Sequence, residues 1–175
     1  MERLRLPELH FRKWHFQKRI MSLSRVIKII GSYRKCGYKV VLANGCFDIL
    51  HVGHVRYLND SKRGNNELLI VAVNGDKSAR MLKGKGRPVL NENDRASLVA
   101  SLKSVDFVVI FNSADVTRIL NRLIPDYHSK GTDYTVDTVP EKGVSEKLGI
   151  KIRIAGDQKS HSTTNLLKKL YANLA

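Results

Sequence analysis

The sequence is poor in cysteine and in acidic residues, and it has no long apolar run. Two cysteines, Cys36 and Cys46, are too few for a disulfide framework. No stretch resembles a signal peptide or a membrane span, so we expect a cytoplasmic protein without a membrane-spanning segment. Internal repeats and low-complexity linkers are also missing. The 175 residues therefore suit one domain over residues 21–175, preceded by a basic extension over residues 1–20.

The shortage of acidic residues gives the chain a strong positive charge. There are 31 Lys and Arg against 16 Asp and Glu, a formal net charge of +15. Such a balance suits nucleic acid, an anionic membrane surface, or an enzyme whose substrates are triphosphates and sugar phosphates. A basic nucleic-acid-binding module is the alternative of a different class. Aromatic side chains, which stack on bases, are sparse outside the first 20 residues, and this argues against it.

Apolar runs and helical patterns alternate along the chain. Strands are expected at residues 40–43, 67–73, 106–111, within 126–134, and at 151–155, and helices over residues 22–37, 53–64, 91–102, 115–123, 139–148 and 162–171. Residues 77–90 are expected to form a basic, glycine-containing loop that could close over an anion. The alternation predicts an α/β fold, a Rossmann-like three-layer α/β/α arrangement with a mostly parallel five-stranded sheet.

The turn after the first expected strand has the chemistry of a phosphate site. A helix beginning near Gly53 offers unpaired backbone N–H groups and a partial positive charge. His51 and His54 are three residues apart, which puts both imidazoles on one face of that helix. A zinc site made by Cys46, His51 and His54 is the alternative, although a structural zinc ion usually has four ligands.

This turn resembles the signature of the nucleotidyltransferase superfamily, in the pair of motifs Gly45-Cys-Phe-Asp48 and His51-x-Gly-His54. Further motifs make the chain similar to the adenylyltransferase family of bacterial ADP-heptose synthesis, in its stand-alone form: Val71-Ala-Val-Asn74, Leu82-Lys-Gly84, Arg87-Pro-Val89, Arg95, Lys130-Gly131, Asp133-Tyr134 and Ser162-Thr-Thr-Asn165. The resemblance implies transfer of AMP from ATP to D-glycero-β-D-manno-heptose 1-phosphate, a step of lipopolysaccharide biosynthesis, with release of pyrophosphate. It also implies Mg²⁺ carried by the ATP phosphates, since no all-protein carboxylate cage is evident.

Chemistry and resemblance together assign roles to individual residues. The catalytic candidates are His51, His54 and Lys83, which would stabilise charge on the phosphates. Asp48 is expected to shape the loop. The substrate phosphate is assigned to Lys83, Lys85 and Arg95. The nucleotide is assigned to Asn44, Gly45, Cys46, Phe47, Gly53, His54, Lys130, Gly131, Asp133, Ser162, Thr163 and Thr164.

Some positions depart from the family pattern and leave alternatives open. Thr132 stands where the heptose family usually has a glycine, and His128-Ser129 makes the fourth strand unusually polar. A glycerol 3-phosphate cytidylyltransferase-like enzyme using CTP is therefore the nearest alternative. Self-association into a homo-oligomer is expected from the family, and apolar residues of the extension such as Trp14 could serve it.

Overall fold

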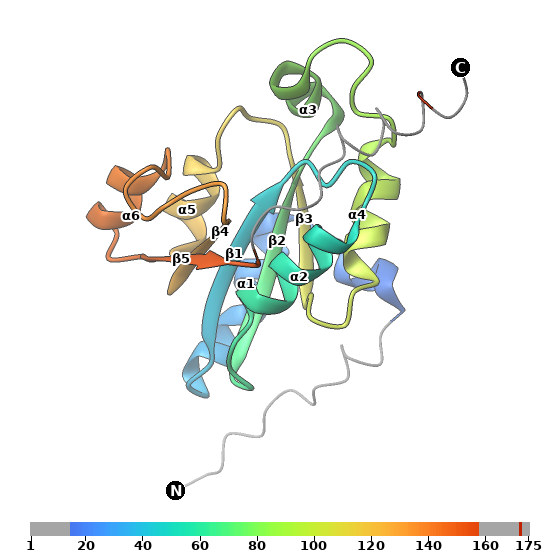
Figure 1. Ribbon diagram of the computed structural model, residues 1–175. Helices are drawn as coiled ribbons and strands as arrows, with labels where there is room; N and C mark the ends of the chain where they lie inside the picture. Colours follow the sequence, from blue (N-terminus) through green and yellow to red (C-terminus); the bar gives the residue numbers. More distant parts are fainter. Residues whose placement is uncertain (1–14, 158–171, 173–175) are drawn as a thin grey trace, which may run out of the picture.

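The computed structural model describes residues 15–157 and residue 172. Five strands form one all-parallel sheet in the order β3-β2-β1-β4-β5, as Figure 1 shows. They are β1 (Lys39–Gly45), β2 (Glu67–Asn74), β3 (Phe107–Phe111), β4 (Tyr127–Gly131) and β5 (Lys151–Ala155). The predicted Rossmann-like α/β class is confirmed. The helix expected over residues 162–171 lies outside the described residues.

Helices cover both faces of the sheet and make three layers. One face packs against α1 (Leu23–Lys35), α5 (Thr117–Leu123) and α6 (Lys142–Lys147), and the other against α2 (Val52–Ser61) and α4 (Glu92–Ala100). Alternate residues of each strand enter the two cores: Val40 and Leu42 of β1 face the first, and Val41 and Ala43 the second. Every residue of β2 is buried, as its nearly continuous apolar sequence predicts for a strand covered on both sides.

The loop expected over residues 77–90 is partly a helix, and that prediction was wrong. Helix α3 (Asp76–Lys83) begins at the end of β2 and lies at the carboxyl-terminal edge of the sheet (Figure 1). Tertiary contacts support it, because the Glu92 carboxylate accepts from the Asp76 backbone N–H at 2.8 Å. The helix ends at Gly84, whose φ of +87° only glycine adopts easily.

The described part of the N-terminal extension packs on the domain. A short 3₁₀ helix, η2 (Phe16–Arg19), leads to Ile20, which forms a parallel bridge with Val108 on edge strand β3. The Arg19 guanidinium donates to the Val105 carbonyl oxygen at 2.9 Å. The segment therefore covers part of the sheet edge, which would otherwise expose unpaired backbone groups.

The sheet order creates a crevice between β1 and β4. From β1 the chain proceeds to β2 and β3 on one side, and then crosses back to place β4 and β5 on the other. Ligands of open parallel sheets bind at such a switch point, outside the carboxyl ends of the strands. Asn44 and Gly45 end β1 at this point, and Lys130 and Gly131 end β4.

Candidate functional site

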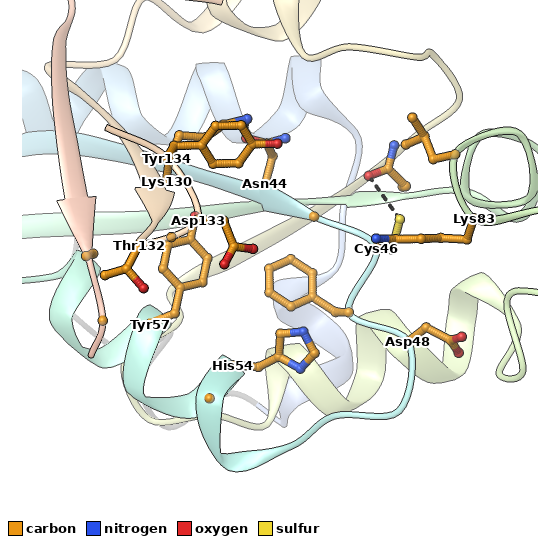
Figure 2. A pocket seen from close by; sticks show the side chains of 18 of the residues that line it. Asn44, Cys46, Asp48, His54, Tyr57, Lys83, Lys130, Thr132, Asp133 and Tyr134 are labelled. Atoms are coloured by element: carbon orange, nitrogen blue, oxygen red, sulfur yellow. Dashed lines mark hydrogen bonds between the residues drawn. The ribbon is translucent and has the colours of Figure 1, made fainter. Parts of the chain in front are cut away.

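A cavity of about 550 Å³ lies at this crevice. Figure 2 shows its two ends, with Asn44 between them. The His54 end is formed by residues 46–48, His51, Gly53 and His54 with Leu82, Lys83 and Arg87. The Lys130 end is formed by residues 130–134 with Pro140, Glu141 and residues 155–157. Tyr57, Asn74, Ala114 and Asp115 also line the cavity. Both ends combine backbone from a strand terminus with charged side chains.

The loop between β1 and α2 has an unusual backbone that Asp48 holds in place. Phe47 and Ile49 adopt φ angles of 50° and 49°, a left-handed conformation that costs free energy for residues with a β-carbon. The buried Asp48 carboxylate accepts from the backbone N–H groups of Val89 and Leu90 at 3.0 and 3.1 Å, and from Arg87 Nε at 2.6 Å. Asp48 thus has the loop-shaping role that the sequence indicated.

Arg95 lies beneath this loop and is completely buried. Its guanidinium donates to the carbonyl oxygens of Cys46, Asn74 and Leu90 at 2.6, 2.7 and 3.0 Å, and to Asp76 Oδ1 at 2.8 Å. The expectation that Arg95 binds the substrate phosphate is corrected, because all three guanidinium nitrogens face protein acceptors and the residue does not line the cavity. Arg95 instead joins the ends of β1 and β2 to the segment before α4.

The two histidines stand at the beginning of α2. His51 is the N-cap residue, and its backbone N–H donates to His54 Nδ1 at 3.4 Å. Nδ1 is therefore the acceptor nitrogen of the His54 ring in this contact. Stacking on His51, with ring centroids 3.9 Å apart, and contact with Phe47 at 5.3 Å fix the plane of the His54 ring. Both histidines line the cavity.

The lysines of the basic segment differ in position. Lys83, the last residue of α3, lines the cavity and lies beside Cys46 in Figure 2. Burial raises the pKa of the Cys46 thiol, while the positive charge of Lys83 acts in the opposite direction. The Lys83 side chain is exposed and makes no hydrogen bond within the described residues. Lys85 is exposed on the following turn and does not line the cavity.

The Lys130 end contains a buried ion pair. Lys130 Nζ lies 3.1 Å from Glu141 Oε2, and the side chains are only 8% and 6% exposed. The ammonium also lies 5.1 Å from the centroid of the Tyr134 ring and donates to Asn44 Oδ1 at 3.4 Å. Glu141 therefore largely neutralises the charge that Lys130 would otherwise present to a ligand.

His128 lies behind this ion pair, in the middle of β4. The side chain is fully buried, and its Nε2 is 3.1 Å from Asn44 Oδ1. Burial, followed by the nearby charge of Lys130, lowers the pKa of His128 to about 3. The imidazole is consequently neutral at physiological pH.

Most of the predicted site residues within the described range lie together in one cavity. Its lining includes Asn44, Gly45, Cys46, Phe47, His51, Gly53, His54, Lys83, Lys130, Gly131 and Asp133. Lys85 and Arg95 are not brought to it, and Ser162, Thr163 and Thr164 lie outside the described residues. Sequence reasoning missed Tyr57, Glu141 and Asp157 as lining residues. Asn74 also lines the cavity; it closes one of the family motifs and ends β2, next to the end of β1.

Two further properties concern metals and membranes. Within residues 15–157 and residue 172, no three or more His, Cys, Asp or Glu side chains are grouped so that they could hold a metal ion. In the same residues, no helix has the length and apolar character needed to cross a membrane.

The sequence matches the cytidylyltransferase-like family over residues 42–168. It is 40% identical over 152 residues to a curated protein named bifunctional protein HldE from Geotalea uraniireducens, covering 87% of this chain and 31% of the relative. The protein of that name from Syntrophotalea carbinolica is 36% identical, with 94% and 34% covered. The chain thus spans about a third of the length of these relatives.

A solved structure is similar as well. It is the crystal structure of the lipopolysaccharide core biosynthesis protein from Thermoplasma volcanium, which is 31% identical. The match has a TM-score of 0.58 and covers 69% of this chain and 98% of that one.

Proposed function

The chain belongs to the cytidylyltransferase-like family of nucleotidyltransferases, and we propose that it transfers AMP from ATP to D-glycero-β-D-manno-heptose 1-phosphate, giving ADP-heptose and pyrophosphate. The observation that carries the proposal is the single cavity that joins the His51 and His54 helix end, Lys83 and the loop after β4. These elements come from distant parts of the sequence. Their convergence offers phosphate donors at one end and room for a nucleoside at the other.

In the proposed reaction, an oxygen of the sugar 1-phosphate attacks the α-phosphorus of ATP. A new P–O bond forms while the bond from the α-phosphorus to the bridging oxygen of pyrophosphate breaks, so no protein nucleophile takes part. The protein positions the reactants and stabilises the charge that develops on the phosphates. His54 suits this task because it lines the cavity at the start of α2, where the His51 backbone N–H donates to its Nδ1 and orients the ring.

Lys83 supplies the mobile positive charge of the mechanism. Its ammonium is exposed beside the cavity, so it can follow the charge that shifts from the attacking phosphate to the leaving group. At the other end, Asp133 can accept a hydrogen bond from a ribose hydroxyl, as acidic residues do in related nucleotide sites. Lys85 has a weaker claim because it lies outside the cavity lining.

Mg²⁺ is proposed to arrive on the ATP phosphates. In proteins, Mg²⁺ usually retains several water ligands and is bound by substrate phosphates and one or two carboxylates. The separate acidic residues that line this cavity are compatible with such binding. When bound, the ion neutralises phosphate charge. The residues of the chain retain the tasks of binding and orientation.

The substrates are proposed from the resemblance of the motifs to the ADP-heptose enzymes. The name of the similar Thermoplasma volcanium protein, which refers to lipopolysaccharide core biosynthesis, supports this choice. The glycerol 3-phosphate alternative would use the same phosphate chemistry with CTP. Only the substrates distinguish the two reactions.

Pyrophosphate release in the presence of Mg²⁺ tests the proposal. ATP, CTP, GTP and UTP are each paired with heptose 1-phosphate and with glycerol 3-phosphate. We expect turnover with ATP and heptose 1-phosphate only. His54→Ala should lower the rate about 10²- to 10³-fold, as loss of a transition-state donor does. Turnover with CTP and glycerol 3-phosphate would replace the substrates, and no turnover with any pair would refute the proposal.

A further inference from the structure

The Asn44 carboxamide occupies a special position in the cavity. It lies at the carboxyl end of β1, between the two ends, where neighbouring strand β4 brings His128 and Lys130 beside it. Its Oδ1 is contacted by both of these side chains, by Lys130 Nζ at 3.4 Å and by His128 Nε2 at 3.1 Å. The two contacts together determine the orientation of the amide.

The chemistry of Lys130 settles which atoms are donors. An ammonium only donates, so the Asn44 atom that faces it must be the oxygen. The same oxygen can then only accept from His128, so Nε2 of His128 must carry the ring hydrogen. Glu141 keeps Lys130 in place through the 3.1 Å ion pair. The low pKa of His128 agrees with this neutral tautomer.

The amide nitrogen of Asn44 is the remaining polar atom of this side chain. Within the described residues, Nδ2 makes no hydrogen bond, and the side chain belongs to the cavity lining. We propose that His128, together with Lys130, fixes the Asn44 carboxamide so that Nδ2 donates to an acceptor oxygen of the bound nucleotide, on its ribose or α-phosphate. This inference rests on the proposed function. Asn44 is then a binding residue, and His128 a positioning residue that acts through it.

Two substitutions of His128 separate positioning from packing. In His128→Gln, the side-chain amide nitrogen reaches the place of Nε2 and keeps a donor for Asn44. In His128→Asn, the amide nitrogen reaches only the place of Nδ1, although the residue is equally polar. We expect His128→Asn to raise the dissociation constant of ATP about five- to tenfold, as loss of one hydrogen bond does, and His128→Gln to change it less than about twofold.

Isothermal titration calorimetry with ATP and with inorganic pyrophosphate provides the measurement. Pyrophosphate has neither the ribose nor the α-phosphate, so its affinity should be the same in wild type and in both variants. The Asn44→Ala background supplies the second test: there, His128→Asn should weaken ATP binding no further, because the residue through which it acts is gone. Thermal melts confirm that each variant is folded.

Three outcomes would overturn the inference: equal weakening by Gln and Asn, a pyrophosphate affinity that falls in parallel, or an effect of His128→Asn that persists without Asn44. Each would indicate a general packing role. Failure of the proposed function looks different. A wild-type protein that binds CTP and not ATP refutes the proposed donor, and the variants are then measured with CTP. If no nucleoside triphosphate binds, both proposals are refuted.

Discussion

The two ends of the cavity use positive charge differently. At the His54 end, the Arg95 and Arg87 side chains donate to protein acceptors, while the Lys83 side chain is exposed and makes no hydrogen bond within the described residues. At the Lys130 end, the only lining lysine of residues 130–134 is paired with buried Glu141. Among the described residues, positive charge open to a ligand is therefore concentrated at one end of the cavity, which matches a molecule that is anionic at one end and uncharged at the other.

The same comparison separates arginine from lysine. A guanidinium is planar and has five N–H donors, so Arg95 can join carbonyl oxygens from three segments at once. An ammonium on a flexible stem cannot maintain such a frame, but it can follow a moving charge. We infer that arginine builds the His54 end and that lysine acts there.

Removing the frame should have the largest effect. Arg95→Met leaves the buried carbonyl oxygens of Cys46 and Asn74 without a donor, so we expect the free energy of unfolding to fall by about 3–5 kcal/mol. Urea unfolding followed by circular dichroism measures it. Arg80→Met, an exposed arginine on α3, is the matched control and should change little. Equal losses in both variants would contradict a special role for Arg95.

Removing the mobile charge should affect the rate and not the fold. Lys83→Met is expected to lower kcat/KM about 10²- to 10³-fold, with the free energy of unfolding changed by less than about 0.5 kcal/mol because the side chain is exposed. Lys77→Met is the matched control, because Lys77 lies on the first turn of the same helix and outside the cavity. It removes the same charge as Lys83→Met and should retain activity. A similar rate loss in Lys77→Met would mean that only overall charge matters.

The elements of the sheet could be predicted from sequence because burial restricts composition. Strand β2 needed apolar residues on both faces, and its sequence is almost uninterrupted. Helix α3 was missed because its basic, glycine-flanked sequence is typical of a loop, while its start depends on Glu92, 16 residues away. Local propensity could not reveal that contact.

The site was predicted where the chain is continuous and missed where segments converge. The run from Asn44 to His54 lies on one strand, loop and helix, so its residues could be placed together by motif. Arg95 lies on a helix next to a basic segment, which equally suggested a phosphate ligand. Its role depends on carbonyl oxygens from β1 and β2 that only the fold assembles. No sequence pattern indicated a role for Glu141, for the same reason.

A smaller effect, dependent on pH, would sharpen the contrast between the two ends. In the folded protein, burial lowers the pKa of His128 from 6.5 to about 3. Between these two pH values the unfolded chain therefore binds a proton at His128 and the folded protein does not. The contribution of neutral His128 to the free energy of unfolding is therefore fully present above pH 6.5. It is lost as the pH falls toward 3, by up to about 1.4 kcal/mol per pH unit. Wild type should lose about 2 kcal/mol relative to His128→Gln between pH 7 and pH 5.

Urea unfolding of both proteins at pH 7, 6 and 5 measures this difference, and the Gln variant cancels the contribution of every other titrating group. Parallel curves would mean that the folded protein binds a proton at His128 as readily as the unfolded chain does, with an ordinary imidazole pKa. Below about pH 6.5 a charged imidazole would then stand beside Lys130, and among the described residues Glu141 alone is paired with that lysine. The Lys130 end would be positive like the His54 end, and the division of the cavity into a charged and a neutral half would fail.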